Sequence, residues 1–362
     1  MFFSFGKNCA IYIDASYAEK WGNMGLSEVT ESADQSTYDK AAAKLSLFRV
    51  SDLEAKNCMN GGADHCYSPV QFLDKKLGVL IQKNGESDFS IFSTQECPEW
   101  FTLMTEIVLL LSDQTLIHAA ALEKDGKALL LPARGGVGKT ATVVQMIRKH
   151  GWKLLGDDLV ILNGEGVVRS YFKKITIYGW HQNLYPELFE KHKGPVKSSH
   201  LNYVIKNMIP TAKKVLRLFP PAFNYIRKHN PQHILISPYD LFKPEELSPV
   251  ANKIQYTMWL ERVEDNDTIV SAASTEDVAS RAAAATLNEL TYGTMNLNYC
   301  LTTMCSCGML DYNMLYGRLY GIIFYSIQNS SKYLLKIPQS YRVETVADCV
   351  CERICGIEHE KM

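Results

Sequence analysis

Two stretches decide the fold of this chain: Ala128–Thr140 reads ALLLPARGGVGKT, and Leu154–Leu162 reads LLGDDLVIL. The first joins a short apolar run to a glycine-rich turn, and the second places two adjacent carboxylates inside an apolar run. The pattern predicts a strand, a phosphate-binding loop, a helix and a second strand. This order of elements is typical of proteins that bind a nucleoside triphosphate together with a metal ion.

The segment Ala133–Thr140 matches the phosphate-loop pattern Gly-x-x-x-x-Gly-Lys-[Ser/Thr], except that Ala133 replaces the first glycine. Its glycines keep side chains away, so backbone N–H groups at the start of the next helix can point at phosphate oxygens. We expect Lys139 to reach the β- and γ-phosphates and Thr140 to offer its hydroxyl to Mg²⁺. The residues expected to contact the nucleotide are Ala133, Arg134, Gly135, Gly136, Val137, Gly138, Lys139, Thr140 and Thr142.

The sequence around this loop supports the motif against the alternative, a glycine-rich turn that binds nothing. Leu129–Leu131 is an apolar run typical of a buried strand. Apolar spacing predicts a helix over Thr140–His150 that ends at Gly151. Its expected inner face consists of Val143, Val144, Met146 and Ile147.

The paired carboxylates Asp157 and Asp158 lie inside the predicted strand Trp152–Leu162. Buried carboxylates are costly unless a metal or hydrogen bonds satisfy them, and neighbouring side chains of a regular strand point to opposite faces. Gly156 favours a local break that would bring the pair together. One carboxylate could then hold Mg²⁺ while the other accepts a proton from a hydroxyl. The alternative is a structural pair that caps the strand end.

His118 belongs to the predicted strand Leu116–Leu122, which the turn Lys124–Lys127 joins to Leu129–Leu131. Asp-Gly between two apolar runs is a strong hairpin signal. The hairpin would place His118 near the mouth of the loop. There it is either a site residue or, as is commoner for a lone histidine, a structural one.

The order His, hairpin, loop, helix and Asp-Asp strand resembles the HPr kinase/phosphorylase family, and more closely its shorter relatives, the HPr-kinase-like serine kinases. The resemblance covers roughly residues 115 to 355 and is strongest over the first fifty or so. It rests on Ile117–Ala119, Ala133–Thr140 and Gly156–Val160, and more weakly on Met258–Arg262, Ser274–Ala283 and Tyr333–Pro338.

The resemblance implies an α/β fold with a P-loop core of the HPr-kinase-like (PEP carboxykinase-like) type, and ATP and Mg²⁺ as cofactors. By this likeness Lys139 and Thr140 hold phosphate and metal, Asp157 is the base, Asp158 assists with metal, and His118 lines the transfer site. The Arg-Gly-x-Gly signature of the true HPr enzymes has no match after the Asp pair. HPr as substrate and the reverse phosphorolysis are therefore not implied.

The first 97 residues predict a small mixed or β-rich domain of unknown role, placed before a catalytic domain over 98–362. That second domain would begin with the apolar helix Trp100–Leu111. The N-terminal part contains a hairpin turn at Lys83–Glu86 and four strand-like pieces: Ala10–Ile13, Leu45–Val50, Leu77–Ile81 and Asp88–Phe92.

A basic insert at about 191–239 holds nine Lys or Arg and no Asp or Glu. Three interpretations are open: a basic helix pair that packs on the core, a grip for an acidic or phosphorylated substrate, or a peripheral helix at an anionic membrane. No nucleic-acid-binding module pattern accompanies the charge.

The whole chain has 38 Lys or Arg and 39 Asp or Glu, so its composition gives no general attraction to nucleic acid. No apolar run approaches the roughly 18 residues of a membrane span, and no signal peptide is expected at Met1–Phe5. The ten cysteines then predict reduced thiols in a cytoplasmic protein. Two cysteine groups are either metal ligands or buried thiols: Cys305 with Cys307, and Cys349 with Cys351 and Cys355.

The sequence thus predicts an ATP- and Mg²⁺-dependent kinase that transfers the γ-phosphate to a hydroxyl. The acceptor would be a Ser or Thr of a peptide or protein, or a small hydroxylated metabolite. The alternatives are a nucleotide-binding regulatory or scaffold protein and a simple ATPase. The acceptor, the choice of ATP over GTP and the oligomeric state are not predicted, because loops that vary on one fold build such sites.

Overall fold

The computed structural model describes residues 1–5, 8–15, 31–54, 59–60, 64–172, 174–178, 233–264, 267–291, 297–339 and 343–360. The protein is a mixed α/β protein with two compact units. The first unit comprises Met1–Lys173 and Glu245–Met362, and the second comprises Lys174–Pro244. None of the helices in the described ranges combines the length and the apolarity that a bilayer crossing requires.

The described part of the second unit contains the antiparallel pair β16 (Ile175–Tyr178) and β17 (His233–Ile236), followed by the short helix α9 (Pro238–Leu241). A 3₁₀ helix, η5 (Pro244–Glu246), leads back to the first unit. Most of the basic insert at 191–239 lies outside the described residues. The three interpretations of that insert therefore stay predictions.

The N-terminal residues of the first unit form a sheet whose nine described strands follow the order β3-β1-β2-β4-β9-β8-β7-β6-β5. Strands β2, β4, β8 and β9 confirm the four strands that the sequence predicts. The strand bounds are β1 (Phe2–Phe5), β2 (Cys9–Ile13), β3 (Glu31–Ala33), β4 (Ala43–Arg49), β5 (Met59–Asn60), β6 (His65–Tyr67), β7 (Gln71–Asp74), β8 (Val79–Gly85) and β9 (Asp88–Ser93).

Two details of this sheet differ from the sequence analysis. The predicted turn at Lys83–Glu86 lies later, because β8 continues through Gly85, which pairs with Asp88. Asn84 holds this extension by donating a hydrogen bond of 2.9 Å from Nδ2 to Ser90 Oγ. The short helix α2 (Gln35–Lys40) was not predicted, and the side chain of Asp34 caps its start.

Helix α3 (Pro98–Leu111) confirms the apolar helix predicted at Trp100–Leu111, and ten of its 14 residues are buried. It packs against β4 and β9 of the N-terminal sheet and also against β10 of the following sheet. One hydrophobic cluster extends from Phe3 to Ile327. The division of the chain at residue 97 into two domains stays a prediction.

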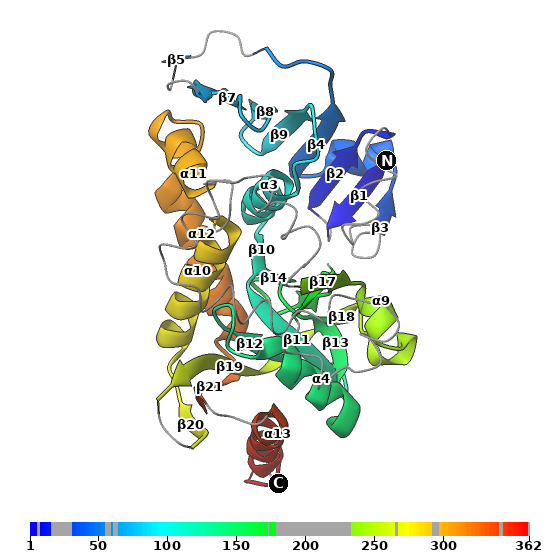
Figure 1. The fold of residues 1–362 in the computed structure, drawn as a ribbon, viewed down its shortest axis with the longest axis vertical. Helices are drawn as coiled ribbons and strands as arrows, with labels where there is room; N and C mark the ends of the chain where they lie inside the picture. The colour runs from blue at the N-terminus through cyan, green and yellow to red at the C-terminus, as the bar shows by residue number, and fades with distance from the viewer. Residues whose placement is uncertain are drawn as a thin grey trace, which may run out of the picture. The chain divides into compact units, whose positions relative to one another are not determined.

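Two further sheets build the part of the first unit that carries the phosphate loop (Figure 1). The described strands follow the orders β10-β14-β15-β18 and β13-β11-β12-β19-β21-β20. Their bounds are β10 (Gln114–Ile117), β11 (Ala119–Lys124), β12 (Lys127–Pro132), β13 (Lys153–Gly156), β14 (Val160–Asn163), β15 (Val168–Arg169), β18 (Val250–Ala251), β19 (Lys253–Val263), β20 (Ile269–Ala272) and β21 (Ser331–Pro338).

The chain passes between these two sheets at two neighbouring places. β10 pairs with β14, where Ile117 lies opposite Val160, and β11 pairs with β13, where Ala121 lies opposite Gly156. His118 stands in the first crossing, and Asp157 and Asp158 stand in the second. The break that Gly156 predicts is therefore present, and it faces the histidine.

Helices cover these sheets. α4 (Lys139–His150) follows the loop, ends at Gly151 in the left-handed region, and buries the four apolar residues predicted for its inner face. α10 (Thr275–Thr291) packs against both α11 (Leu297–Ser306) and α12 (Tyr312–Ile327), as Figure 1 shows in yellow and orange. The last helix, α13 (Val343–Glu360), packs against α4.

Candidate nucleotide-binding and phosphotransfer site

The phosphate loop connects β12 to α4. Gly136 and Gly138 have φ values of 80° and 101°, a left-handed conformation that side chains with a Cβ rarely adopt. Ala133 needs no such freedom, since Asp113 and Asp125 are the described non-glycine residues with positive φ. Ala133 is buried and forms a parallel bridge with Leu260 of β19. The departure from the strict motif is thus structurally neutral, and the loop anchors to the neighbouring strand.

Lys139 starts α4, and its side chain bends back over the loop. Lys139 as a whole is only 7% exposed. Nζ donates a hydrogen bond of 2.9 Å to the carbonyl oxygen of Ala133 and lies 3.2 Å from His118 Nε2. The ammonium group therefore stands beside the loop carbonyls and the histidine.

His118 is buried at the crossing between β10 and β11 and contacts Asp158. Its Nε2 lies 2.9 Å from Asp158 Oδ1. A histidine that donates from Nε2 to this carboxylate leaves Nδ1, which is 3.4 Å from Lys139 Nζ, to accept from the ammonium. His118 thus links the loop lysine to the second aspartate.

Asp157 lies on the other side of the aspartate pair and contacts Thr140. Thr140 Oγ1 donates a hydrogen bond of 2.8 Å to Asp157 Oδ2. Asp157 is 9% exposed, whereas the side chain of Asp158 is 41% exposed. The two neighbouring carboxylates therefore have different partners and different access to solvent, as two distinct chemical tasks would require.

Gly156 makes the turn of the aspartate pair possible. A Cβ at this position would meet the carbonyl oxygen of Leu159 and Cγ1 of Val160, each at 2.6 Å. Real Cβ atoms do not approach that closely, so the chain can fold back after β13 only at a glycine. The residue that the sequence marks as a strand breaker thus sets the position of both carboxylates.

Helix α10 supplies two residues that sequence reasoning did not place in the site. Thr286 Oγ1 accepts a hydrogen bond of 2.9 Å from the backbone N–H of His118, which fixes the first crossing. Glu289, one turn later, accepts a hydrogen bond of 3.1 Å at Oε1 from the backbone N–H of Gly135. A carboxylate thus occupies a loop N–H of the kind that binds phosphate oxygens.

The remaining loop residues differ in their surroundings. Arg134 is exposed beside the loop, and Val137 is buried. Thr142 is fully buried in α4, and its contact with a nucleotide stays a prediction. Arg262 lies away from the loop glycines in sequence, and it donates a hydrogen bond of 2.6 Å to the carbonyl oxygen of Pro338, which joins β19 to β21.

The oxygen donors of the site suit Mg²⁺. Thr140 offers a hydroxyl, and Asp157 and Asp158 offer carboxylates; such hard oxygen ligands are the ones that Mg²⁺ prefers. The grouped cysteines do not join this set. Within the described ranges Cys305, Cys307, Cys349 and Cys351 form no disulfide, and none of them belongs to a metal-type cluster. The backbone of Cys355 belongs to α13, but its side chain is not among those that the structure describes.

A comparison with known proteins gives a distant and partial match. The chain is 30% identical over 86 residues to an HPr kinase/phosphorylase of Malacoplasma penetrans (strain HF-2). The aligned part is 23% of this chain and 28% of that relative, so the match spans less than a third of the relative's length. No protein-family model matches the chain. The match suggests a relation to that family and hints at a kinase-like function.

Proposed function

We propose that the protein is an ATP-dependent kinase that transfers the γ-phosphoryl group to a hydroxyl acceptor. The observation that supports the proposal best is a single network of contacts. Lys139 Nζ lies 3.4 Å from His118 Nδ1, His118 Nε2 lies 2.9 Å from Asp158 Oδ1, and Thr140 Oγ1 donates a hydrogen bond of 2.8 Å to the neighbouring Asp157. These contacts bring the loop lysine, the hydroxyl of Thr140 and two carboxylates together beside the phosphate loop, which supports a role for them at the γ-phosphate of a loop-bound nucleotide.

Each residue has a task in this proposal. Lys139 and the loop N–H groups bind the β- and γ-phosphates and offset their negative charge. Asp157 accepts the proton of the attacking hydroxyl, and His118 holds Asp158 in place. Thr140 and Asp158 would hold Mg²⁺, which when bound adds positive charge next to the transferring group. Because Asp157 contacts Thr140, the opposite assignment is also tested: Asp157 would bind Mg²⁺ and Asp158 would accept the proton.

For the acceptor we propose an acidic or phosphorylated compound, either a peptide segment or a small metabolite. The support is the charge of the segment over 191–239, which falls next in sequence after the strands of the site and has nine cations without an acidic residue. A positive segment of this kind raises the local concentration of anionic substrates. Contact of the same segment with an anionic membrane is the competing outcome.

The purified chain incubated with γ-labelled ATP, Mg²⁺ and an extract of its own host tests the kinase. We expect label on one acceptor, and no label with Lys139→Ala. Label that appears only as free phosphate would establish an ATPase instead. Nucleotide binding without any consumption of ATP would establish a regulatory or scaffold protein.

A further inference from the structure

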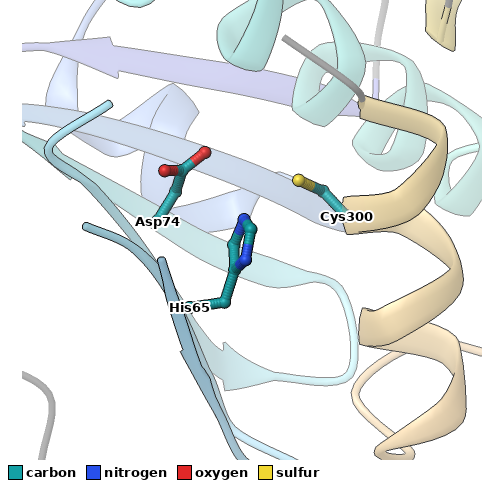
Figure 2. Close-up of side chains that lie close together, drawn as sticks. All are labelled: His65, Asp74 and Cys300. Carbon is teal, nitrogen blue, oxygen red and sulfur yellow. The ribbon is translucent and has the colours of Figure 1, made fainter. Parts of the chain in front are cut away.

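The N-terminal sheet and helix α11 bring together three potential metal ligands that lie far from one another in sequence. They are His65 of β6, Asp74 of β7 and Cys300 of α11. One nitrogen, one oxygen and one sulfur from these side chains all lie within 4.8 Å of one another. Figure 2 shows the imidazole, the carboxylate and the thiol directed toward a common point.

The backbone fixes this convergence. His65 and Asp74 are directly opposite each other in the antiparallel pair of β6 and β7, so their side chains share a face. Ser68 holds the turn between these strands, because its Oγ accepts hydrogen bonds from the N–H groups of Val70 and Gln71. Cys307 Sγ lies 3.2 Å from the carbonyl oxygen of Ser68, which joins this turn to the end of α11.

The buried carboxylate of Asp74 lacks a compensating positive charge among the described residues. Asp74 is 2% exposed, and a buried carboxylate is costly unless charge and hydrogen bonds compensate it. Among the described residues its partner is the N–H of Leu77, at 3.0 Å from Oδ1, and no Lys or Arg pairs with it. A cation at the point where the three side chains converge would supply the missing charge.

The surroundings of the other two ligands are apolar. The imidazole of His65 packs between the rings of Phe72 and Tyr299, with centroids 5.6 and 5.3 Å away, and makes no hydrogen bond within the described ranges. The thiol of Cys300 is 1% exposed. The burial of Asp74 and Cys300 limits the access of water to the site, which strengthens the binding of a cation.

From this geometry we propose that His65, Asp74 and Cys300 bind one Zn²⁺ ion, which fastens the end of the N-terminal sheet to α11. Mixed nitrogen, sulfur and oxygen donors suit Zn²⁺, whereas Mg²⁺ and Ca²⁺ prefer oxygen alone. A tetrahedral Zn²⁺ holds its ligand atoms roughly 3.3 to 3.8 Å apart, so closure of the site needs side-chain shifts of about 1 Å. Water would complete the coordination.

Metal analysis and Co²⁺ substitution of the 362-residue chain, without nucleotide, test this site. After treatment with a chelator and reconstitution, we expect one Zn²⁺ per chain. With Co²⁺ we expect a sulfur-to-metal absorption band, because the thiolate binds the ion directly. Co²⁺ bound instead at the carboxylates of the phosphotransfer site would give no such band.

Matched variants assign the ligands. The band should vanish in Cys300→Ser and persist in Cys305→Ser, which removes a neighbouring thiol of the same helix. His65→Gln and Asp74→Asn should weaken Zn²⁺ binding at least about tenfold. If Cys300→Ser does not fold, two other measurements decide whether the site binds Zn²⁺. They are the Co²⁺ spectrum of the wild type and the Zn²⁺ affinity of His65→Gln, whose position is only half-buried. A folded wild-type chain without the band, or a band that Cys305→Ser abolishes equally, would overturn the proposal.

Discussion

The hydroxyl of Thr140 and the carboxylate of Asp157 meet at 2.8 Å, although the first belongs to the helix after the phosphate loop and the second to the turn after β13. The hydroxyl is the group with which a phosphate loop binds Mg²⁺, and the carboxylate is one of two that the chain places beside it. This contact joins the helix that follows the phosphate loop to the turn that carries the aspartate pair.

Thr140→Val tests the role of that hydroxyl, since valine keeps the branched shape but neither donates a hydrogen bond nor binds a metal. We expect the rate of phosphoryl transfer to fall by about 100-fold or more, as for the loss of other preorganised charge-stabilising groups. Thr140→Ser keeps the hydroxyl and should stay close to wild type at saturating Mg²⁺. Equal rates for the two variants would contradict the role.

Gly156→Ala tests the turn that positions the aspartates. The added methyl group would lie 2.6 Å from both the Leu159 carbonyl oxygen and Val160 Cγ1, so the turn must shift. We expect a loss of about 1–3 kcal/mol in the free energy of unfolding and reduced transfer. The control is Gly164→Ala, because a Cβ there has no neighbour within 4 Å. Denaturant unfolding of both variants gives the comparison, and equal stability would count against this account.

Glu289→Gln tests the carboxylate that accepts the hydrogen bond from Gly135. The charge at this position competes with phosphate for the loop N–H and repels it. We expect the variant to bind ATP about 3- to 10-fold more tightly, which corresponds to about 1 kcal/mol. Glu276→Gln removes an exposed charge from the first turn of the same helix and should leave the affinity unchanged. Titration calorimetry measures both; weaker binding by Glu289→Gln would show a supporting role instead.

The raised pKa of the Glu106 carboxyl determines how the free energy of unfolding should depend on pH. Burial raises the pKa of this carboxyl to about 8, although hydrogen bonds from Thr115 and the N–H of Leu116 partly oppose the shift. The folded state therefore keeps its proton up to about pH 8, while the unfolded state loses it above about pH 4.5. Across this window Glu106 should reduce the free energy of unfolding by about 1.4 kcal/mol per pH unit.

Glu106→Gln removes this titration and keeps the shape of the side chain. The stability difference between the variant and the wild type should grow in favour of the variant from pH 5 to pH 8. Urea unfolding at several pH values measures it. A difference that does not change with pH would show that Glu106 is already ionised in the folded protein.

The sequence predicted the local elements of the site because their signals are local. Glycines mark the loop, the end of α4 and the break before Asp157, and apolar spacing marks α3, β12 and α4. The Asp-Gly turn placed β11 beside β12 with Lys124 opposite Lys127. Other local patterns were too weak to predict the structure. The turn after β8 lies later than predicted. The short elements β3 and α2 were not predicted, because they fall in a polar stretch without clear periodicity.

The tertiary contacts could not be predicted in the same way. Glu289 reaches Gly135 across 154 positions, and neither residue carries a pattern that relates it to the other. The same holds for His65, Asp74 and Cys300, which share no motif spacing. The sequence instead favours the closely spaced cysteines as candidate ligands, because known zinc motifs are recognised by short spacing.

Phosphoryl transfer is tested most directly by Asp157→Asn. ATP affinity and labelled-acceptor formation are both measured on this variant. Asp158→Asn is the paired variant and is measured in the same way. We expect Asp157→Asn to lose phosphoryl transfer while its ATP affinity stays unchanged. We expect Asp158→Asn to need a higher Mg²⁺ concentration. The opposite pattern would exchange the tasks of the two aspartates. Undiminished ATP turnover in both variants would contradict the account.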